Sequence, residues 1–404
     1  MADILRVFSV FVLIVLLLRK RLSIGLSMLI GAGALSALYL MPPRIVLSTI
    51  YNSLTSEVTI KLLIALTSIK VFELILRERN VLAQMMDASK GLLRNKKAIV
   101  ISMPLLIGML PSVGGAYFSA PMVEESAKGT KTTAEERGFI NYWYRHPWEY
   151  ILPLYPGVVL ASLISGLDMR RLIVLNLPSA VMLAITGFFF GLRNIEGTVE
   201  QVPELSKKVF INFLPLVAII VLVAVFKVEL HWALIASVVV LFLVFRYRAN
   251  DIFRALRHGL ELDVILLIAG VMIFKEMMEA SGAVKNISIY FREIGVALIP
   301  TLFFLPFMTG LLTGLTVGFV GSTFPLILSL LGKMNLSLLE FSASVSFAFV
   351  SGYMGVLFSP VHVCFILTRQ YFKADLLGMY KKIIPAGLIV LALGLIQYLV
   401  LRAF

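Results

Sequence analysis

Ten long apolar runs dominate this chain of 404 residues. Each run is about as long as a helix that crosses roughly 30 Å of hydrocarbon. The runs fall near residues 4–18, 22–41, 58–77, 139–163, 170–193, 207–226, 229–245, 259–279, 340–367 and 379–402. Because a helix satisfies its own backbone hydrogen bonds inside a bilayer, the runs predict an all-α integral membrane protein with about ten transmembrane helices. A mean hydropathy of +0.96 agrees with this prediction.

Two further apolar segments, near residues 98–125 and 296–332, are interrupted by proline and glycine. Their broken centres, residues 105–118 and 311–325, lie about 206 residues apart, which is half the chain. Proline and glycine at matching positions favour two short helices that turn back inside the membrane. We therefore expect a re-entrant hairpin in each half of the chain.

The order of segments repeats between residues 1–202 and 203–404. Each half has its hairpin, followed by a long run that proline or small residues interrupt, at 139–163 and 340–367. Five crossings in each half is an odd number, so the second half must enter the membrane with opposite polarity. These features predict two inverted-topology repeats, an arrangement typical of secondary transporters.

Basic residues gather in the short segments between the runs. They include Arg19, Lys20, Arg21, Arg77, Arg79, Lys90, Arg94, Lys96, Lys97, Arg246, Arg248, Arg254, Arg257, Arg369, Lys373, Lys381 and Lys382. All of them fall on one side if each hairpin returns to the side it entered from, and that side is cytoplasmic by the positive-inside rule. This predicts both termini outside. It also accounts for the net charge of +13 without a nucleic-acid partner.

Only one cysteine, Cys364, is present. A disulfide framework or a cysteine-based metal site within one chain is therefore not expected. No pair of histidine and carboxylate has a convincing metal spacing either. We expect no cofactor, and no metal beyond a possible Na⁺ as coupling ion.

The first hairpin tip contains Pro111, Ser112, Gly114 and Gly115. Proline stops a helix, and glycines permit close approach of the backbone. The tip would present unpaired backbone groups and a hydroxyl to a ligand, with Pro111 near the coupling ion. The alternative is that the glycines only pack helices tightly.

The sequence places the second tip at Gly318, Gly321, Ser322 and Thr323. The two adjacent hydroxyls would hydrogen-bond the substrate, and the glycines would contact the coupling ion. The alternative for each hydroxyl is a hydrogen bond to the preceding turn of its own helix.

The first interrupted run carries Arg145, His146, Pro147 and Glu149. Glu149 lies about ten residues into the run, roughly 15 Å deep, where ionisable groups are costly and usually functional. Pro147 should open the backbone beside them. We expect Arg145 to attract an anion, and His146 with Glu149 to exchange a proton. The alternative is a self-neutralising Arg145–Glu149 pair at i,i+4.

The corresponding part of the second half has Ser351, Gly352 and His362 but no charged residue between them. Ser351 and Gly352 would offer a hydroxyl and open backbone to the substrate. His362 would carry a proton, although a hydrogen-bonded core histidine is an equal alternative.

These motifs resemble the ion transporter superfamily, which includes the divalent anion/sodium symporters and the citrate and gluconate permeases. The chain is most similar to a ten-helix prokaryotic family, domain of unknown function 401, through the sequence LPSVGGAYFSAP at residues 110–121. The resemblance implies a homodimer whose transport domain slides past a scaffold, in the inner membrane of a prokaryote. It also implies a substrate and ion site at the hairpin tips and interrupted helices. The dicarboxylate carriers of this superfamily share a Ser-Asn-Thr signature at both tips. The tips of this chain differ from that signature, because neither contains an asparagine.

The sequence thus predicts a secondary active transporter, not an enzyme. A small organic anion would move with Na⁺ or H⁺ by elevator-type alternating access, with the lipid bilayer as the surrounding partner. Two alternatives stay open. One is a channel built from the re-entrant hairpins. The other is an intramembrane hydrolase using Ser351 and His362, although no G-x-S-x-G motif surrounds Ser351.

Overall fold

The computed structural model describes residues 2–20, 22–81, 84, 95–109, 115–197, 208–283, 286, 298–332 and 334–403. Three predicted site residues, Pro111, Ser112 and Gly114, lie outside this part of the chain. Every regular element in the described ranges is helical, as the apolar runs predicted.

The first half contains helices α1 to α4, two short helices, an interrupted segment and a closing helix. Their bounds are α1 Ala2–Arg19, α2 Ile24–Leu38, α3 Pro43–Thr55, α4 Glu57–Glu78, α6 Lys96–Gly108, α7 Gly115–Ser126, α8 Ala134–Trp143, η1 Pro147–Tyr150, α9 Pro156–Ser165 and α10 Met169–Gly191.

The second half follows the same order. Its bounds are α11 Lys208–Ala224, α12 Leu230–Val244, α13 Ala249–Gly259, α14 Leu262–Ala280, α16 Leu298–Thr313, α17 Thr316–Leu331, α18 Leu338–Phe358, α19 Val363–Phe372 and α20 Leu376–Ala403. The helices α1 and α11 begin at residues 2 and 208, and α3 and α13 begin at residues 43 and 249. The short helices α3 and α13 are additional to the predicted runs.

Within the described residues, three helical stretches are long and apolar enough to cross a membrane: Met169–Gly191, Leu338–Phe372 and Leu376–Ala403. Several shorter apolar helices accompany them, including α2, α12, α16 and α17. Large apolar side chains on the outer surfaces, such as Phe189, Leu243 and Leu388, are more than half exposed. A soluble protein rarely exposes apolar surface so widely, and the chain is a membrane protein.

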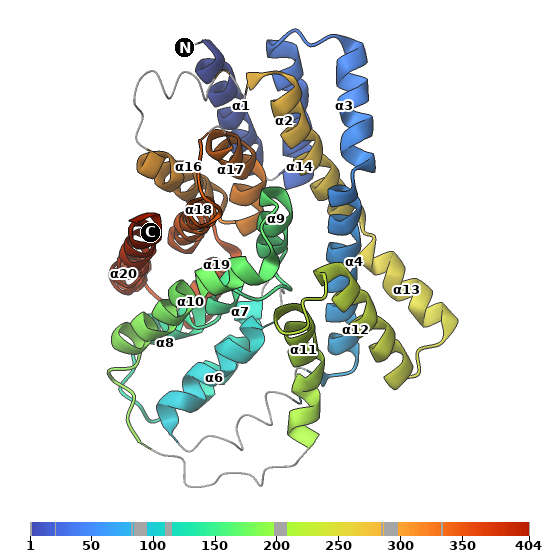
Figure 1. The fold of residues 1–404 in the computed structure, drawn as a ribbon. Helices are drawn as coiled ribbons and strands as arrows, with labels where there is room; N and C mark the ends of the chain where they lie inside the picture. The colour runs from blue at the N-terminus through green and yellow to red at the C-terminus, as the bar shows by residue number, and fades with distance from the viewer. Residues whose placement is uncertain are drawn as a thin grey trace.

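The helices form two groups, each of which draws on both halves of the chain (Figure 1). In the first group, α2 and α3 pack against α14, and α4 packs against α12 and α13. In the second group, α18 packs against α16 and α20, α17 against α9, and α19 against α7 and α8. We call these the outer group (α1–α4 and α11–α14) and the inner group (α6–α10 and α16–α20).

Ion pairs join the two halves within the outer group. Lys70 of α4 pairs with Glu261 before α14, and Lys61 pairs with Glu229 at 2.7 Å. At the other end of α4, Arg254 of α13 pairs with Glu78 at 3.1 Å. These contacts explain several of the charges that interrupt the apolar runs.

The helices α8 and α18 begin with the same local device. Thr133 accepts a hydrogen bond from the Glu136 N–H, and the Glu136 side chain accepts one from the Thr133 N–H. Ser337 and Glu340 form the equivalent capping box on α18. Each box satisfies N–H groups that a helix start leaves unpaired, so the two interrupted segments start from equivalent, fixed positions.

Candidate functional site at two helix breaks

The first break, residues 144–155, separates α8 from α9 and holds the 3₁₀ turn η1. It contains Pro147 and Pro153, and α9 starts on Pro156. Proline has no backbone N–H and cannot continue the hydrogen-bond ladder of a helix, which explains the break. Arg145 and Glu149 are buried within it, with exposures of 2% and 8%. The predicted interruption of this run is present in the structure.

Side chains of the first break bind the end of α6, which with α7 forms the first helix pair. Trp148 Nε1 donates to the Leu105 carbonyl at 2.7 Å, Tyr155 donates to the Gly108 carbonyl, and Arg145 Nη1 donates to the Ile107 carbonyl at 3.5 Å. The last carbonyls of a helix lack partners within it, so these donors satisfy them. A cation at this end is also favoured by the helix dipole.

The end of α6 and the first break approach each other so closely that no side chain fits between them at Gly108. A Cβ on Gly108 would lie 2.2 Å from the Arg145 carbonyl oxygen. Gly108 therefore lets the backbone of α6 touch the backbone of the first break.

The second break, residues 359–362, separates α18 from α19. Ser359 precedes Pro360, and the residue before a proline is disfavoured in helical conformation. The buried His362 caps α19 and places its Nδ1 2.7 Å from the Gly314 carbonyl oxygen. Gly314 forms the turn between α16 and α17, the second helix pair, with φ of +64°. The second break thus touches the second helix pair, as the first break touches the first pair.

The two breaks meet in the interior. Nε2 of His146 lies 3.1 Å from Nε2 of His362, and the Tyr353 hydroxyl donates to the His146 carbonyl at 3.0 Å. Thr316, two residues after Gly314, donates to Glu149 Oε2 at 3.0 Å. Side chains from both halves and from the second helix pair therefore share one buried polar cluster.

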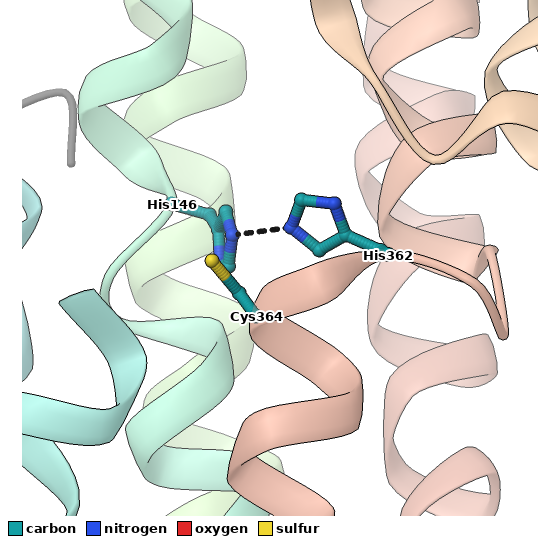
Figure 2. A group of neighbouring side chains, drawn as sticks. All are labelled: His146, His362 and Cys364. Atoms are coloured by element: carbon teal, nitrogen blue, oxygen red, sulfur yellow. Dashed lines mark hydrogen bonds between the residues drawn. The ribbon is translucent and has the colours of Figure 1, made fainter. Parts of the chain in front are cut away.

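Cys364 completes this cluster. Its thiol and the ring nitrogens of His146 and His362 all lie within 4.8 Å of one another, and all three residues are buried. Figure 2 shows the three side chains converging, one from the first break and two from around the start of α19. Counting cysteines predicted no cysteine-based metal site, but it overlooked a mixed set of one thiol and two imidazoles.

The turn of the second helix pair lies earlier than the sequence predicted. Gly318, Gly321, Ser322 and Thr323 are inside α17, not at its tip. Ser322 donates to the Gly318 carbonyl at 2.6 Å and Thr323 to the Phe319 carbonyl at 2.7 Å. Both hydroxyls bond back to their own helix, the alternative that the sequence left open. The positive φ of Gly314 explains why the chain turns there instead.

Ser351 and Gly352 lie inside the continuous helix α18, so the expectation of open backbone at these residues was wrong. The Ser351 hydroxyl donates to the Phe347 carbonyl at 2.8 Å. A Cβ on Gly352 would come within 2.4 Å of the Phe319 ring. These small residues let α18 pack closely, whereas the interruption itself falls at Ser359 and Pro360.

Arg145 and Glu149 do not form a helical i,i+4 arrangement, because α8 ends at Trp143. Glu149 faces Thr316 and His146, whose Nε2 lies 3.9 Å from Oε1. Gly115 is the first residue of α7 and is buried. His146, His362, Glu149 and Arg145 are thus brought near the meeting point of the breaks, while Ser322, Thr323 and Ser351 bond elsewhere.

Sequence reasoning missed the residues that hold the cluster together. Tyr142 donates to the Leu357 carbonyl at 2.9 Å, and Tyr150 and Tyr353 pack edge to face with ring centroids 4.7 Å apart. Cys364, Thr316 and Gly314 were also missed. The partners are about 200 residues apart in sequence, so no local spacing indicates them; only the tyrosines beside His146 were a weak signal.

A family model, described as Protein of unknown function (DUF401), matches residues 1–401. No curated protein matches the chain. The family match covers both breaks, both helix pairs and nearly every other residue. The chain therefore belongs to the DUF401 family.

Proposed function

We propose that this protein is a secondary active transporter of a small organic anion, coupled to Na⁺ or H⁺. The observation that carries the proposal is the meeting of two helix breaks, each touching its own short helix pair, around the buried Arg145 and Glu149. Irregular backbone and charged groups are costly in a membrane interior, and ionisable groups buried there usually mark a pathway for a substrate or an ion.

Arg145 is the residue we assign to the anion. Its guanidinium is a permanent cation with a planar fork of donors, which suits carboxylate and phosphate groups. The guanidinium lies beside the C-terminal end of α6. Its hydrogen bond to the Ile107 carbonyl is long, at 3.5 Å. An anion can replace such a carbonyl. Ser322 and Thr323 would reach the anion only by exchanging their present backbone acceptors for it.

The proposed movement is a displacement of the inner group relative to the outer group. The inner group contains both helix pairs and both breaks, whereas the outer group is tied together by ion pairs such as Lys61–Glu229. Arg145 is buried, so a substrate reaches it only when helices around it move. An elevator-type alternation, with two inverted-topology repeats of about five crossings each, supplies that movement.

We further propose that the protein works as a homodimer in the inner membrane of a prokaryote, with both termini outside. The basic segments between helices support this orientation. In the structure, Glu57, Gly166 and Glu229, which the predicted topology assigns to the outside, line one cavity of about 420 Å³. Their proximity supports a common side for these three loops.

A panel of small organic anions tests the binding step. A ligand that binds the native state raises the melting temperature by mass action. We expect at least one mono- or dicarboxylate to stabilise the purified wild-type protein and to lose that effect in Arg145→Lys. Arg193, which is exposed, provides the matched control Arg193→Lys. Equal stabilisation of wild type and Arg145→Lys would contradict the role of Arg145, and a non-saturable flux of the same anion would favour a channel.

A further inference from the structure

The ring nitrogens of His146 and His362 have fixed roles. His146 Nδ1 lies 2.5 Å from the Tyr142 carbonyl oxygen, and His362 Nδ1 lies 2.7 Å from the Gly314 carbonyl oxygen. A carbonyl oxygen can only accept a hydrogen bond, so both Nδ1 atoms carry the hydrogen. In the neutral rings, both Nε2 atoms therefore present lone pairs, and these face each other at 3.1 Å. Two facing lone pairs repel unless a positive centre lies between them.

The Cys364 sulfur lies beside the same two nitrogens. All three atoms are within 4.8 Å of one another, and the three residues are at most 8% exposed. The side chains come from two distant parts of the chain but point to one spot (Figure 2). The permanently charged Arg145 also faces this sulfur. A proton shared between the imidazoles, with the sulfur hydrogen-bonded to both rings, is the alternative to a metal cation at this spot.

We propose that His146, His362 and Cys364 bind a soft divalent cation of the Zn²⁺ class. Zinc binds histidine nitrogen at about 2.0–2.1 Å and cysteine sulfur at about 2.3 Å. Two nitrogens on a tetrahedral zinc are then about 3.3 Å apart, close to the 3.1 Å between the two Nε2 atoms. The two nitrogens therefore need to move only slightly, and the sulfur, which lies within 4.8 Å of both, would move in to complete the set.

The surroundings match those of a metal site. Ligating histidines usually donate their other ring N–H to a carbonyl or carboxylate, which fixes the ring orientation. Here the carbonyls of Tyr142 and Gly314 do this. Glu149 Oε1, 3.9 Å from His146 Nε2, is placed to approach as a fourth ligand, while Thr316 holds its other oxygen. A thiolate and a carboxylate together balance the charge of a divalent cation, and Arg145 adds one further positive charge beside the sulfur.

The metal would join the two halves of the inner group, since His146 lies in the first break and the other two ligands lie at the second. It would therefore stabilise the contact between the breaks. This inference goes beyond the proposed transport function and does not depend on it, because metal binding is measured without any substrate.

Cobalt(II) substitution in the full-length protein is the direct test. The protein is purified with an affinity tag that contains no histidine. A chelator removes bound metal under reducing conditions, and the protein is then titrated with Co²⁺. We expect one Co²⁺ per chain, a thiolate-to-cobalt charge-transfer band and release of the thiol proton. Because Cys364 is the only cysteine, that band in the wild type assigns the ligand without a mutation.

Variants then assign the histidines. We expect Cys364→Ser, His146→Gln and His362→Gln each to weaken binding by at least tenfold. The chain has four histidines, so His231→Gln and His258→Gln are matched controls that should bind normally. Zn²⁺ should raise the melting temperature of the wild type and of the controls. If the wild type gives neither the charge-transfer band nor a Zn²⁺-dependent rise in melting temperature, the proposal is overturned in favour of a shared proton. It is also overturned if the two control variants lose as much metal affinity as the ligand variants.

Discussion

The first break extends over residues 144–155 and carries Arg145 and Glu149, whereas the second spans only residues 359–362 and has no charged side chain apart from the titratable His362. Both have the same place in their half of the chain, and both follow a helix that begins with a capping box. The first break supplies donors to the carbonyls at the end of α6. The second supplies one imidazole to the carbonyl of the turn at Gly314.

The difference separates architecture from chemistry. Proline and capping residues fix where each interruption lies, and both halves keep them. The charged and aromatic side chains are concentrated in the first break, where the longer irregular segment leaves room for Trp148, Tyr150 and Tyr155. Substitutions in the first break should therefore affect binding of a charged substrate. Substitutions around the second break should instead affect the stability of the turn at Gly314.

The largest expected effect is loss of anion affinity in Arg145→Ala. Hydrogen bonds to a charged group are worth about 1.5–3 kcal/mol, so affinity should fall roughly ten- to a hundredfold. Binding of the anion identified by thermal stabilisation measures this, with Arg193→Ala as an exposed control. Unchanged affinity in Arg145→Ala would remove the functional distinction between the two breaks.

Gly314→Ala should destabilise the protein by about 2 kcal/mol. The left-handed conformation at φ +64° costs an alanine about 1–2 kcal/mol, and the new Cβ would lie 2.9 Å from the His362 backbone. Gly166 has φ +70° but nothing within 4 Å of a Cβ. Gly166→Ala therefore measures the conformational strain alone. Equal losses of melting temperature in the two variants would show that the contact between the turn and the second break is unimportant.

Thr316→Val removes the hydroxyl that donates to Glu149 while keeping the shape of the side chain. A hydrogen bond to a carboxylate of this burial should contribute about 1.5 kcal/mol. Thr316→Ser keeps the donor and should retain most of that stability. If valine and serine variants unfold at the same temperature, the link between the second helix pair and the first break contributes little.

The smallest effect is expected for Trp148→Phe. Phenylalanine keeps most of the ring packing but cannot donate to the Leu105 carbonyl, so the loss should be about 1 kcal/mol. Trp232, which is exposed on α12, offers the control Trp232→Phe. A melting temperature for Trp148→Phe no lower than that of the control would argue against anchoring of α6 by the first break.

Local signals in the sequence were sufficient for the long helices and for the first break, but not for the short helices α3 and α13. Apolar runs gave helix positions to within a few residues, and Pro147 and Pro153 indicated the interruption. The prediction for Ser351 and Gly352 was wrong because small residues occur both where the backbone is open and where helices pack closely. The neighbouring Phe319 ring, which leaves no room for a side chain at Gly352, distinguishes the two cases. The grouping of His146 with His362 and Cys364 depends on tertiary packing between distant segments, which no local spacing encodes.

Concentrative uptake into proteoliposomes tests the central claim most directly. Vesicles containing the full chain are given the stabilising anion outside under an imposed Na⁺ gradient, an imposed pH gradient or neither. The account predicts that one gradient drives saturable accumulation above the outside concentration, that an ionophore collapses it, and that Arg145→Ala abolishes it. Flux that only equilibrates the anion, whatever the gradient, would contradict secondary active transport.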